Sequence, residues 1–180
     1  MALKSTVYKA ELSVADMDRH YYATHNLTLA MHPSETEERL MVRVLAFALH
    51  ANEALTFGRG LSSDDEPDLW QKDLTGAIEL WIQVGQPDEK WLRKACGRAR
   101  QVWVYCYAKS ADIWWEQNRR QLERLENLTV IQLSPSTTEG LAAMAQRGMQ
   151  LQASVQDGQL WLADANQQLA CDYQRLMGPG

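Results

Sequence analysis

The chain has 180 residues, of which 46% are hydrophobic and 23% are charged, and its formal net charge at neutral pH is −5. These values are typical of a soluble globular protein, and the acidic balance excludes a protein that coats nucleic acid through overall positive charge. No apolar run approaches the ~20 residues that a membrane-spanning helix needs, so we expect no membrane association.

The amino terminus and the cysteines together predict a cytoplasmic protein. Residues 1–6 lack the apolar segment of a secretory signal peptide. The three cysteines, Cys96, Cys106 and Cys171, are odd in number and form no CxxC pair. We therefore expect small, buried, reduced thiols, as in a reducing compartment.

The first fifty residues carry the signals of a hairpin followed by a helix. Apolar and polar side chains alternate on both sides of a polar turn, which predicts an antiparallel hairpin within residues 1–31. Ser34 and Glu37 have the spacing of a capping box, in which two side chains satisfy free amides at a helix start. An apolar stripe at helical spacing over residues 40–49 predicts that a helix follows this box.

The middle of the chain is typical of strands and helices in alternation. Residues 54–84 indicate strands separated by glycine-containing turns. Pro87 suits the first position of a helix, and the acidic residues after it suit the first turn, so we predict a helix over residues 87–98. The continuous apolar run at 102–107 predicts an interior strand that is covered on both faces.

The last third of the chain predicts further elements of both kinds. Ser136 and Glu139 have the spacing of a second capping box, and Asp157-Gly158 is typical of a two-residue hairpin turn. We expect the tail after this hairpin to be loose. The remaining predicted elements are a helix at 111–125 and a strand at 128–133.

Together these elements predict one mixed α/β domain over residues 1–180, with antiparallel and parallel strand pairs in a single sheet. Its parts would be an N-terminal β-hairpin at 1–31, a core at about 34–133, and a C-terminal helix and β-hairpin at about 136–170.

Two acidic residues on neighbouring strands form the candidate site. Glu79, Trp81 and Gln83 alternate along one strand and so share one of its faces, and Asp68 belongs to the strand before it. A two-residue turn between the strands would place Asp68 opposite Trp81 and diagonal to Glu79 and Gln83, roughly 7–8 Å away at the backbone. A slightly longer turn would place it opposite Glu79 or the next residue.

This grouping predicts a magnesium site for phosphodiester hydrolysis, because Mg²⁺ prefers one or two carboxylates and leaves its other positions to water and substrate. Asp68 and Glu79 are the expected metal ligands, and Gln83 would position water. The strand carries no lysine, so Lys90 or Lys94 of the following helix would stabilise charge instead. The alternative is that both acids lie on a solvated sheet face.

Four further residues could extend this site. Asp65 and Glu38 could add carboxylates, and Arg59 and Arg93 could hold an anion such as a phosphate. Each also has a simpler explanation as a solvent-exposed residue of a turn or of a helix.

Long strings in the chain resemble one bacterial family over essentially its whole length. The most extended are LTLAMHPSET at 27–36 and LWIQVGQPDE at 80–89, and shorter ones lie at 1–4, 64–67, 113–115 and 156–158. By these strings the chain resembles the YaeQ family. The resemblance implies a variant of the PD-(D/E)XK nuclease fold, which is a restriction-endonuclease-like mixed sheet flanked by helices.

The resemblance also implies roles for particular residues. Asp68 would be the motif aspartate and Glu79 the second acid, but Trp81 then stands where the motif lysine belongs. Moving the motif two residues along the strand puts Gln83 in the lysine position and leaves Trp81 where the acid is required. Neither alignment restores the full motif.

Two functions remain open at this stage. One is a protein that binds nucleic acid and hydrolyses it with Mg²⁺. The other is a catalytically inactive scaffold of the same fold that binds a protein partner or regulates one. An unrelated small-molecule role is a third hypothesis.

Overall fold

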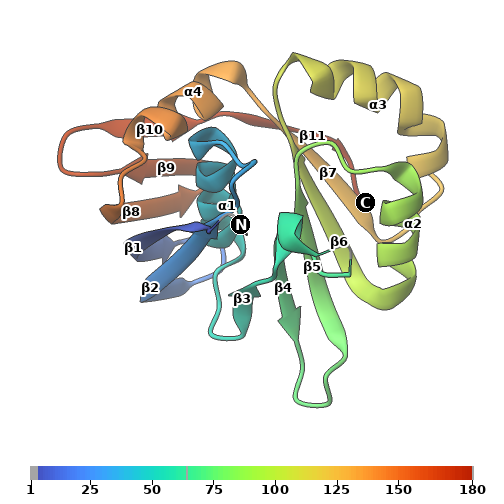
Figure 1. Ribbon diagram of the computed structural model, residues 1–180, viewed down its shortest axis with the longest axis horizontal. Coiled ribbons are helices and arrows are strands. Elements are labelled where there is room, and N and C mark those ends of the chain that lie inside the picture. Colours follow the sequence, from blue (N-terminus) through green and yellow to red (C-terminus); the bar gives the residue numbers. More distant parts are fainter. Residues whose placement is uncertain (1–3, 64, 180) are drawn as a thin grey trace. The chain divides into compact units, whose positions relative to one another are not determined.

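The computed structural model describes residues 4–63 and 65–179, and these fold into two compact units. Unit 1 consists of Met1–Asn52 and Ser136–Asp172, and unit 2 of Glu53–Pro135 and Tyr173–Gly180. Each unit has its own sheet (Figure 1). The prediction of a single sheet is therefore wrong, whereas the mixed α/β class is confirmed, because each sheet contains both parallel and antiparallel pairs.

Unit 1 unites the two hairpins that the sequence analysis predicts at opposite ends of the chain. Its five strands lie in the order β10-β9-β8-β1-β2, and β1 pairs in parallel with β8. The elements are β1 (Thr6–Asp16), β2 (Tyr21–Met31), α1 (Glu37–His50), α4 (Pro135–Met144), β8 (Gly148–Gln156), β9 (Gln159–Ala163) and β10 (Gln168–Cys171).

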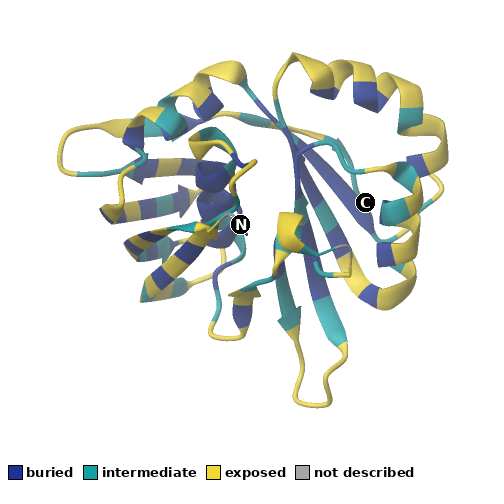
Figure 2. Ribbon diagram, in the orientation of Figure 1, coloured by how far each residue is buried: buried dark blue, intermediate teal, exposed yellow. Residues whose placement is uncertain are grey.

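One face of this sheet is buried and the other is open. Burial alternates along β1 and β8, as Figure 2 shows by the stripes on these strands. Helix α1 packs against β1 and β2, and its nine consecutive residues from Leu40 to Ala48 are all buried. The buried Arg43 in this run donates to both carboxylate oxygens of Glu35, at 2.7 and 3.0 Å. This ion pair compensates the charge of the Arg43 guanidinium, which is buried among apolar residues of α1.

Both predicted capping boxes are wrong by about two residues. Helix α1 begins at Glu37 with Thr36 as its cap, because the Thr36 hydroxyl accepts the Arg39 amide at 3.1 Å. Ser34 instead bonds to the ring of His32 within the preceding turn. Helix α4 begins at Pro135, which places Ser136 inside the first turn, and proline is well suited to that first helical position.

Unit 2 contains a six-stranded sheet in the order β11-β7-β6-β5-β4-β3. Strands β5, β6 and β7 are parallel and are joined through α2 and α3, while β3, β4 and β11 pair antiparallel. The elements are β3 (Leu55–Phe57), a 3-10 turn η1 (Gly60–Ser62), β4 (Leu69–Lys72), β5 (Ile78–Val84), α2 (Glu89–Arg98), β6 (Ala99–Cys106), α3 (Lys109–Leu122), β7 (Leu128–Leu133) and β11 (Tyr173–Met177).

Helices α2 and α3 cover one face of the unit 2 sheet. Trp81 of β5, Val102 of β6 and Val130 of β7 meet Leu92 of α2 and Trp114 of α3 in one apolar cluster. The tail is ordered rather than loose, since β10 and β11 add a strand to each sheet. Among the helices that the structure describes, none has the length and apolarity to cross a membrane.

Candidate functional site

The hairpin of β4 and β5, which carries the predicted site, has a register that differs from both predicted ones. Leu69 lies opposite Ile82, and the amide of Asp68 donates to the Ile82 carbonyl at 3.1 Å. Asp68 therefore lies beside Gln83, two positions further along β5 than the two-residue turn would place it. The cause is a wider turn, in which the Asp73 carboxylate accepts the amides of Thr75 and Ala77, together with a bulge at Glu79 of β5, which lies between the residues paired with Gln71 and Lys72.

Asp68 is a buried hydrogen-bond acceptor. Its side chain is almost completely enclosed, with the residue 1% exposed, and its Oδ2 accepts the backbone amide of Val84 at 2.8 Å. The chain before Asp68 turns away from β5 and bonds to the segment at Gly58 and Gly60. A Cβ on Gly60, whose φ is +49°, would lie 2.5 Å from Asp68 Oδ1. The Asp68 carboxylate thus accepts the Val84 amide in place of a backbone carbonyl of a neighbouring strand. It has room to do so because residue 60 is a glycine.

Glu79 lies at the other end of β5. It is four positions before Gln83, which corresponds to about 13 Å along a strand. Its side chain is 33% exposed, and its Oε2 lies 3.4 Å from a guanidinium nitrogen of Arg100. Asp68 and Glu79 therefore do not converge on one ion. Within residues 4–63 and 65–179, no three His, Cys, Asp or Glu side chains gather as a metal site would require.

An amide and a group of indoles occupy the position beside Asp68. The Gln83 carbonyl accepts the ring N–H groups of Trp81 and Trp91, both at 3.3 Å. Trp81 is 1% exposed, and its ring makes edge contacts with those of Trp70 and Trp91 at centroid distances of 6.1 and 5.8 Å. These contacts orient the Gln83 amide as an acceptor for two indoles in the core of unit 2.

Of the four cations of α2, only Arg98 approaches this indole group. Lys90 and Lys94 are exposed, and Arg93 forms an ion pair with Glu89 one turn earlier. Arg98 is the cation that approaches the predicted site, with its guanidinium 5.2 Å from the ring centroid of Trp81. Sequence spacing alone does not select it, because all four cations recur at helical intervals.

The remaining predicted residues are spread over both units. Asp65 is exposed and contributes its carbonyl, which accepts from Arg98 at 3.2 Å. Arg59 is exposed, and its backbone amide donates to Glu66 at 2.9 Å. Glu38 lies in the first turn of α1 and thus belongs to unit 1, whereas Asp68 and Glu79 belong to unit 2.

The cysteines are free thiols, and burial makes them poor nucleophiles at neutral pH. Desolvation raises the pKa of Cys96 to about 11, and it raises the pKa values of Cys106 and Cys171 to about 12. Because the thiolate is the reactive form, covalent catalysis by these residues is disfavoured.

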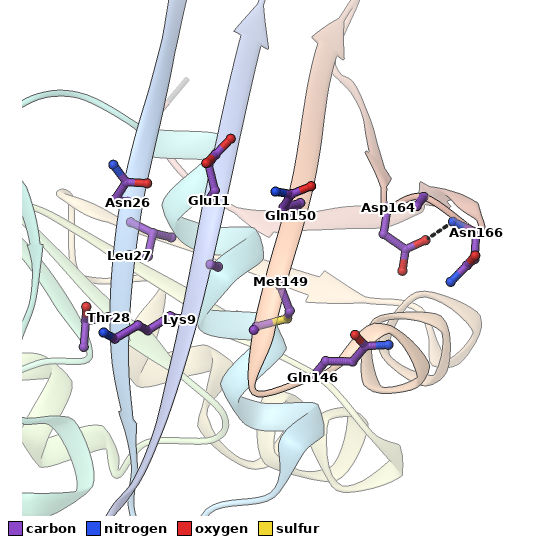
Figure 3. A pocket seen from close by; sticks show the side chains of 13 residues that line it. Lys9, Glu11, Asn26, Leu27, Thr28, Gln146, Met149, Gln150, Asp164 and Asn166 are labelled. Carbon is purple, nitrogen blue, oxygen red and sulfur yellow. Dashed lines mark hydrogen bonds between the residues drawn. The ribbon is translucent and has the colours of Figure 1, made fainter.

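A second candidate site, which the sequence analysis does not identify, lies on the open face of the unit 1 sheet. It is a hollow of about 720 Å³ over β1, β2 and β8, bordered by the loop between β9 and β10 (Figure 3). Eight of its thirteen lining residues have polar side chains. The residues that line it are Lys9, Ala10, Glu11, Asn26, Leu27, Thr28, Gln146, Gly148, Met149, Gln150, Asp164, Ala165 and Asn166.

The sheet register sets the order of these groups. Glu11 of β1 lies between Asn26 of β2 on one side and Gln150 of β8 on the other. The Asp164 carboxylate holds the bordering loop by accepting the amides of Asn166 and Gln167, both at 2.8 Å. In the sequence, polar residues alternate with apolar ones along the strands of both hairpins. These polar residues form one continuous surface only because β1 pairs with β8.

The chemistry of the hollow is that of hydrogen bonding to a polar ligand. Amide, carboxylate, hydroxyl and ammonium groups project from adjacent strands, and the carboxylates of Glu11 and Asp164 accompany the single ammonium of Lys9 among its lining residues. Pockets for small molecules are mostly enclosed, whereas this hollow is wide open to solvent.

The two sheets and the separated acids define a mixed α/β protein with an open polar sheet face. The chain belongs to the YaeQ protein family, which it matches over residues 1–173. The family resemblance in the sequence is therefore confirmed. The nuclease-like classification that it implies stays a prediction.

Bacterial relatives match along nearly the whole chain. The proteins named "Uncharacterized protein YaeQ" from Escherichia coli K12 and Salmonella typhi are 47% and 46% identical, over 91% and 94% of both chains. The crystal structure of the YaeQ protein from Xanthomonas axonopodis pv. citri has a TM-score of 0.93 and 49% identity, covering 97% of this chain and 99% of that one. The structure from Pseudomonas syringae has the same TM-score with 37% identity, covering 97% of each chain.

Proposed function

We propose that this protein is a non-catalytic binding module for a polar protein segment, built on a nuclease-like scaffold that does not hydrolyse phosphodiesters. The observation that carries the proposal is the register of β4 and β5. It sets Gln83 beside Asp68 and Trp81 two positions away, opposite Trp70, where hydrolysis requires a second acid and a lysine.

The chemistry of these side chains supports the proposal. An indole offers no oxygen to a hard cation such as Mg²⁺, and a neutral amide does not supply the positive charge that stabilises a phosphorane-like transition state. The Asp68 carboxylate already accepts the Val84 amide. Glu79 is paired with Arg100 some distance along the strand.

The hollow of unit 1 is the surface that we assign to the partner. Its lining carries more carboxylates than cations, which favours a polar protein segment over the phosphate backbone of a nucleic acid. Its amides alternate with charged groups from strand to strand, so a peptide backbone would find both donors and acceptors there.

Nuclease assays test the non-catalytic half of the proposal. The wild type, Gln83→Ala and the exposed control Gln101→Ala are compared on single- and double-stranded DNA and RNA with Mg²⁺ and with Mn²⁺. We expect no cleavage, or equal traces in all three proteins. Cleavage by the wild type and the control that Gln83→Ala abolishes, with its fold intact, would establish an enzyme.

Photo-cross-linking tests the binding half. A photoreactive amino acid replaces Glu11 in the hollow or, as a control, Gln101 on β6, and cells are irradiated. We expect a discrete protein adduct from the Glu11 position only, which a second substitution in the hollow, Gln150→Arg, removes. Adducts that nuclease treatment shortens would mean a nucleic-acid ligand and would overturn the assignment of a protein partner.

A further inference from the structure

Strand β2 is an unusually unprotected sheet edge. It forms one border of the unit 1 sheet and runs for 11 residues. Its sequence, YYATHNLTLAM, contains no Asp, Glu, Lys, Arg, Pro or Gly. Natural edge strands are usually kept from pairing with other chains by short length, charge, proline or bulges. β2 has none of these devices, which indicates that its edge pairs with another strand.

The hydrogen bonds of β1 show which groups of β2 face outward. The amides of Lys9 and Met17 donate to carbonyls of the β8 side, so odd-numbered residues of β1 bond toward β8 and even-numbered ones toward β2. Leu12 lies opposite His25, so the odd-numbered residues of β2 bond to β1.

The even-numbered residues Tyr22, Thr24, Asn26 and Thr28 therefore direct their backbone amides and carbonyls along the outer edge. Ala30 confirms this assignment, because its carbonyl, which has the same parity, accepts from Arg43 of α1 rather than from β1. The side chains of Tyr22, Thr24, Asn26 and Thr28 are also exposed, Tyr22 by 62%. No steric or charged group of the strand itself blocks a neighbour.

We propose that β2 pairs antiparallel with β2 of a second copy of this chain, which joins two unit 1 sheets across a twofold axis. An isologous contact needs a surface that complements itself, and an uncharged strand meets that condition without like-charge repulsion. Setting Thr24 opposite Asn26 of the second copy also sets Tyr22 opposite Thr28. All four outward residues then pair, with about eight hydrogen bonds between the chains.

The cross-strand neighbours in this register are favourable. Tyr22 lies beside a β-branched Thr28, and Thr24 beside Asn26, a pair that can form side-chain hydrogen bonds. The proposal goes beyond the binding function above and does not depend on it. The side chains of Asn26 and Thr28 line the hollow, whereas the pairing uses the backbone amides and carbonyls at the edge of β2.

Hydrogen exchange resolved by residue tests the geometry, together with sedimentation over a range of concentrations. In the dimer we expect the amides of Tyr22, Thr24, Asn26 and Thr28 to become protected as concentration rises. Protection of the odd-numbered amides, which bond to β1, should not change. A monomer at sub-millimolar concentration, or even-numbered amides that exchange equally at all concentrations, would overturn the proposal.

Two variants and a control connect the dimer to the edge. Thr24→Lys adds a charge at the twofold interface, and Asn26→Pro removes an outward amide without removing a bond to β1. Each should raise the dimer dissociation constant by about tenfold or more. Gln156→Lys, an exposed position on β8, adds the same charge away from the edge and should leave the constant unchanged. A dimer that tolerates both edge variants would place the interface elsewhere.

Discussion

A carboxylate lies beside a glutamine on a neighbouring strand in both units, yet the two pairs differ in what they can do. In unit 2, Asp68 beside Gln83 is buried, and both side chains accept hydrogen bonds from groups of the fold. In unit 1, Glu11 beside Gln150 is exposed at the edge of an open hollow. The same residue types are thus structural in one sheet and available to a ligand in the other, and burial makes the difference.

The largest expected effect comes from removing the buried acceptor. Asp68→Ala leaves the Val84 amide without its carboxylate partner, and we expect unfolding to become easier by about 3 kcal/mol. Urea denaturation followed by circular dichroism measures this loss. Asp68→Asn keeps an acceptor oxygen and should lose clearly less, whereas equal losses would mean that the hydrogen bond is not the cause.

A partly buried histidine, His50, tests whether the removal of a polar group from water also matters in unit 1. Desolvation, assisted by the nearby Arg19, lowers the pKa of His50 to about 3. The unfolded chain binds this proton below about pH 6.5, so the stability present above that pH falls as the pH drops toward 3. We expect the free energy of unfolding to fall by about 2 kcal/mol over this pH range. His50→Gln should flatten that part of the pH profile, measured by thermal unfolding across the range.

Two glycine substitutions distinguish the cost of a steric contact near Asp68 from the cost of backbone strain alone. Gly60→Ala meets both a positive φ and a Cβ 2.5 Å from Asp68 Oδ1, whereas Gly76→Ala has a positive φ in open space. We expect a loss of about 2 kcal/mol for the first and about 1 kcal/mol for the second. Equal melting temperatures for the two variants would show that the space around Asp68 is not tight.

The smallest effects should come from the exposed acids. Glu11→Gln and Glu79→Gln should each change the free energy of unfolding by less than about 0.5 kcal/mol, because exposed charges and exposed ion pairs contribute little. The two variants differ in the cross-linking experiment, where only changes in the hollow should matter. A large destabilisation by Glu79→Gln would indicate a role that its contact with Arg100 does not explain.

Local patterns in the sequence predict most of the elements but not their long-range pairing. The two hairpins, the helices and the parallel strands of unit 2 follow from alternation, helical periodicity and turn residues. The pairing of β1 with β8 joins positions about 140 residues apart, as the bond from Lys9 to Arg147 shows, and no local signal encodes it. The division into two sheets depends on that pairing, and so does the hollow.

The predicted register at the candidate site was wrong for a different reason. Its geometry depended on the length of one turn, and the Asp73 side chain widens that turn by accepting several amides. A shift of two residues was enough to bring Gln83 rather than Glu79 to Asp68. Turn chemistry of this kind is visible in the sequence only once the turn type is known.

The parallel pairing of β1 with β8 also bears on how the chain is made. During synthesis the first hairpin emerges long before β8, so both borders of β1 and β2 are open while some 100 further residues are translated. We therefore expect this hairpin to be the segment that most needs a chaperone until the final third of the polypeptide arrives.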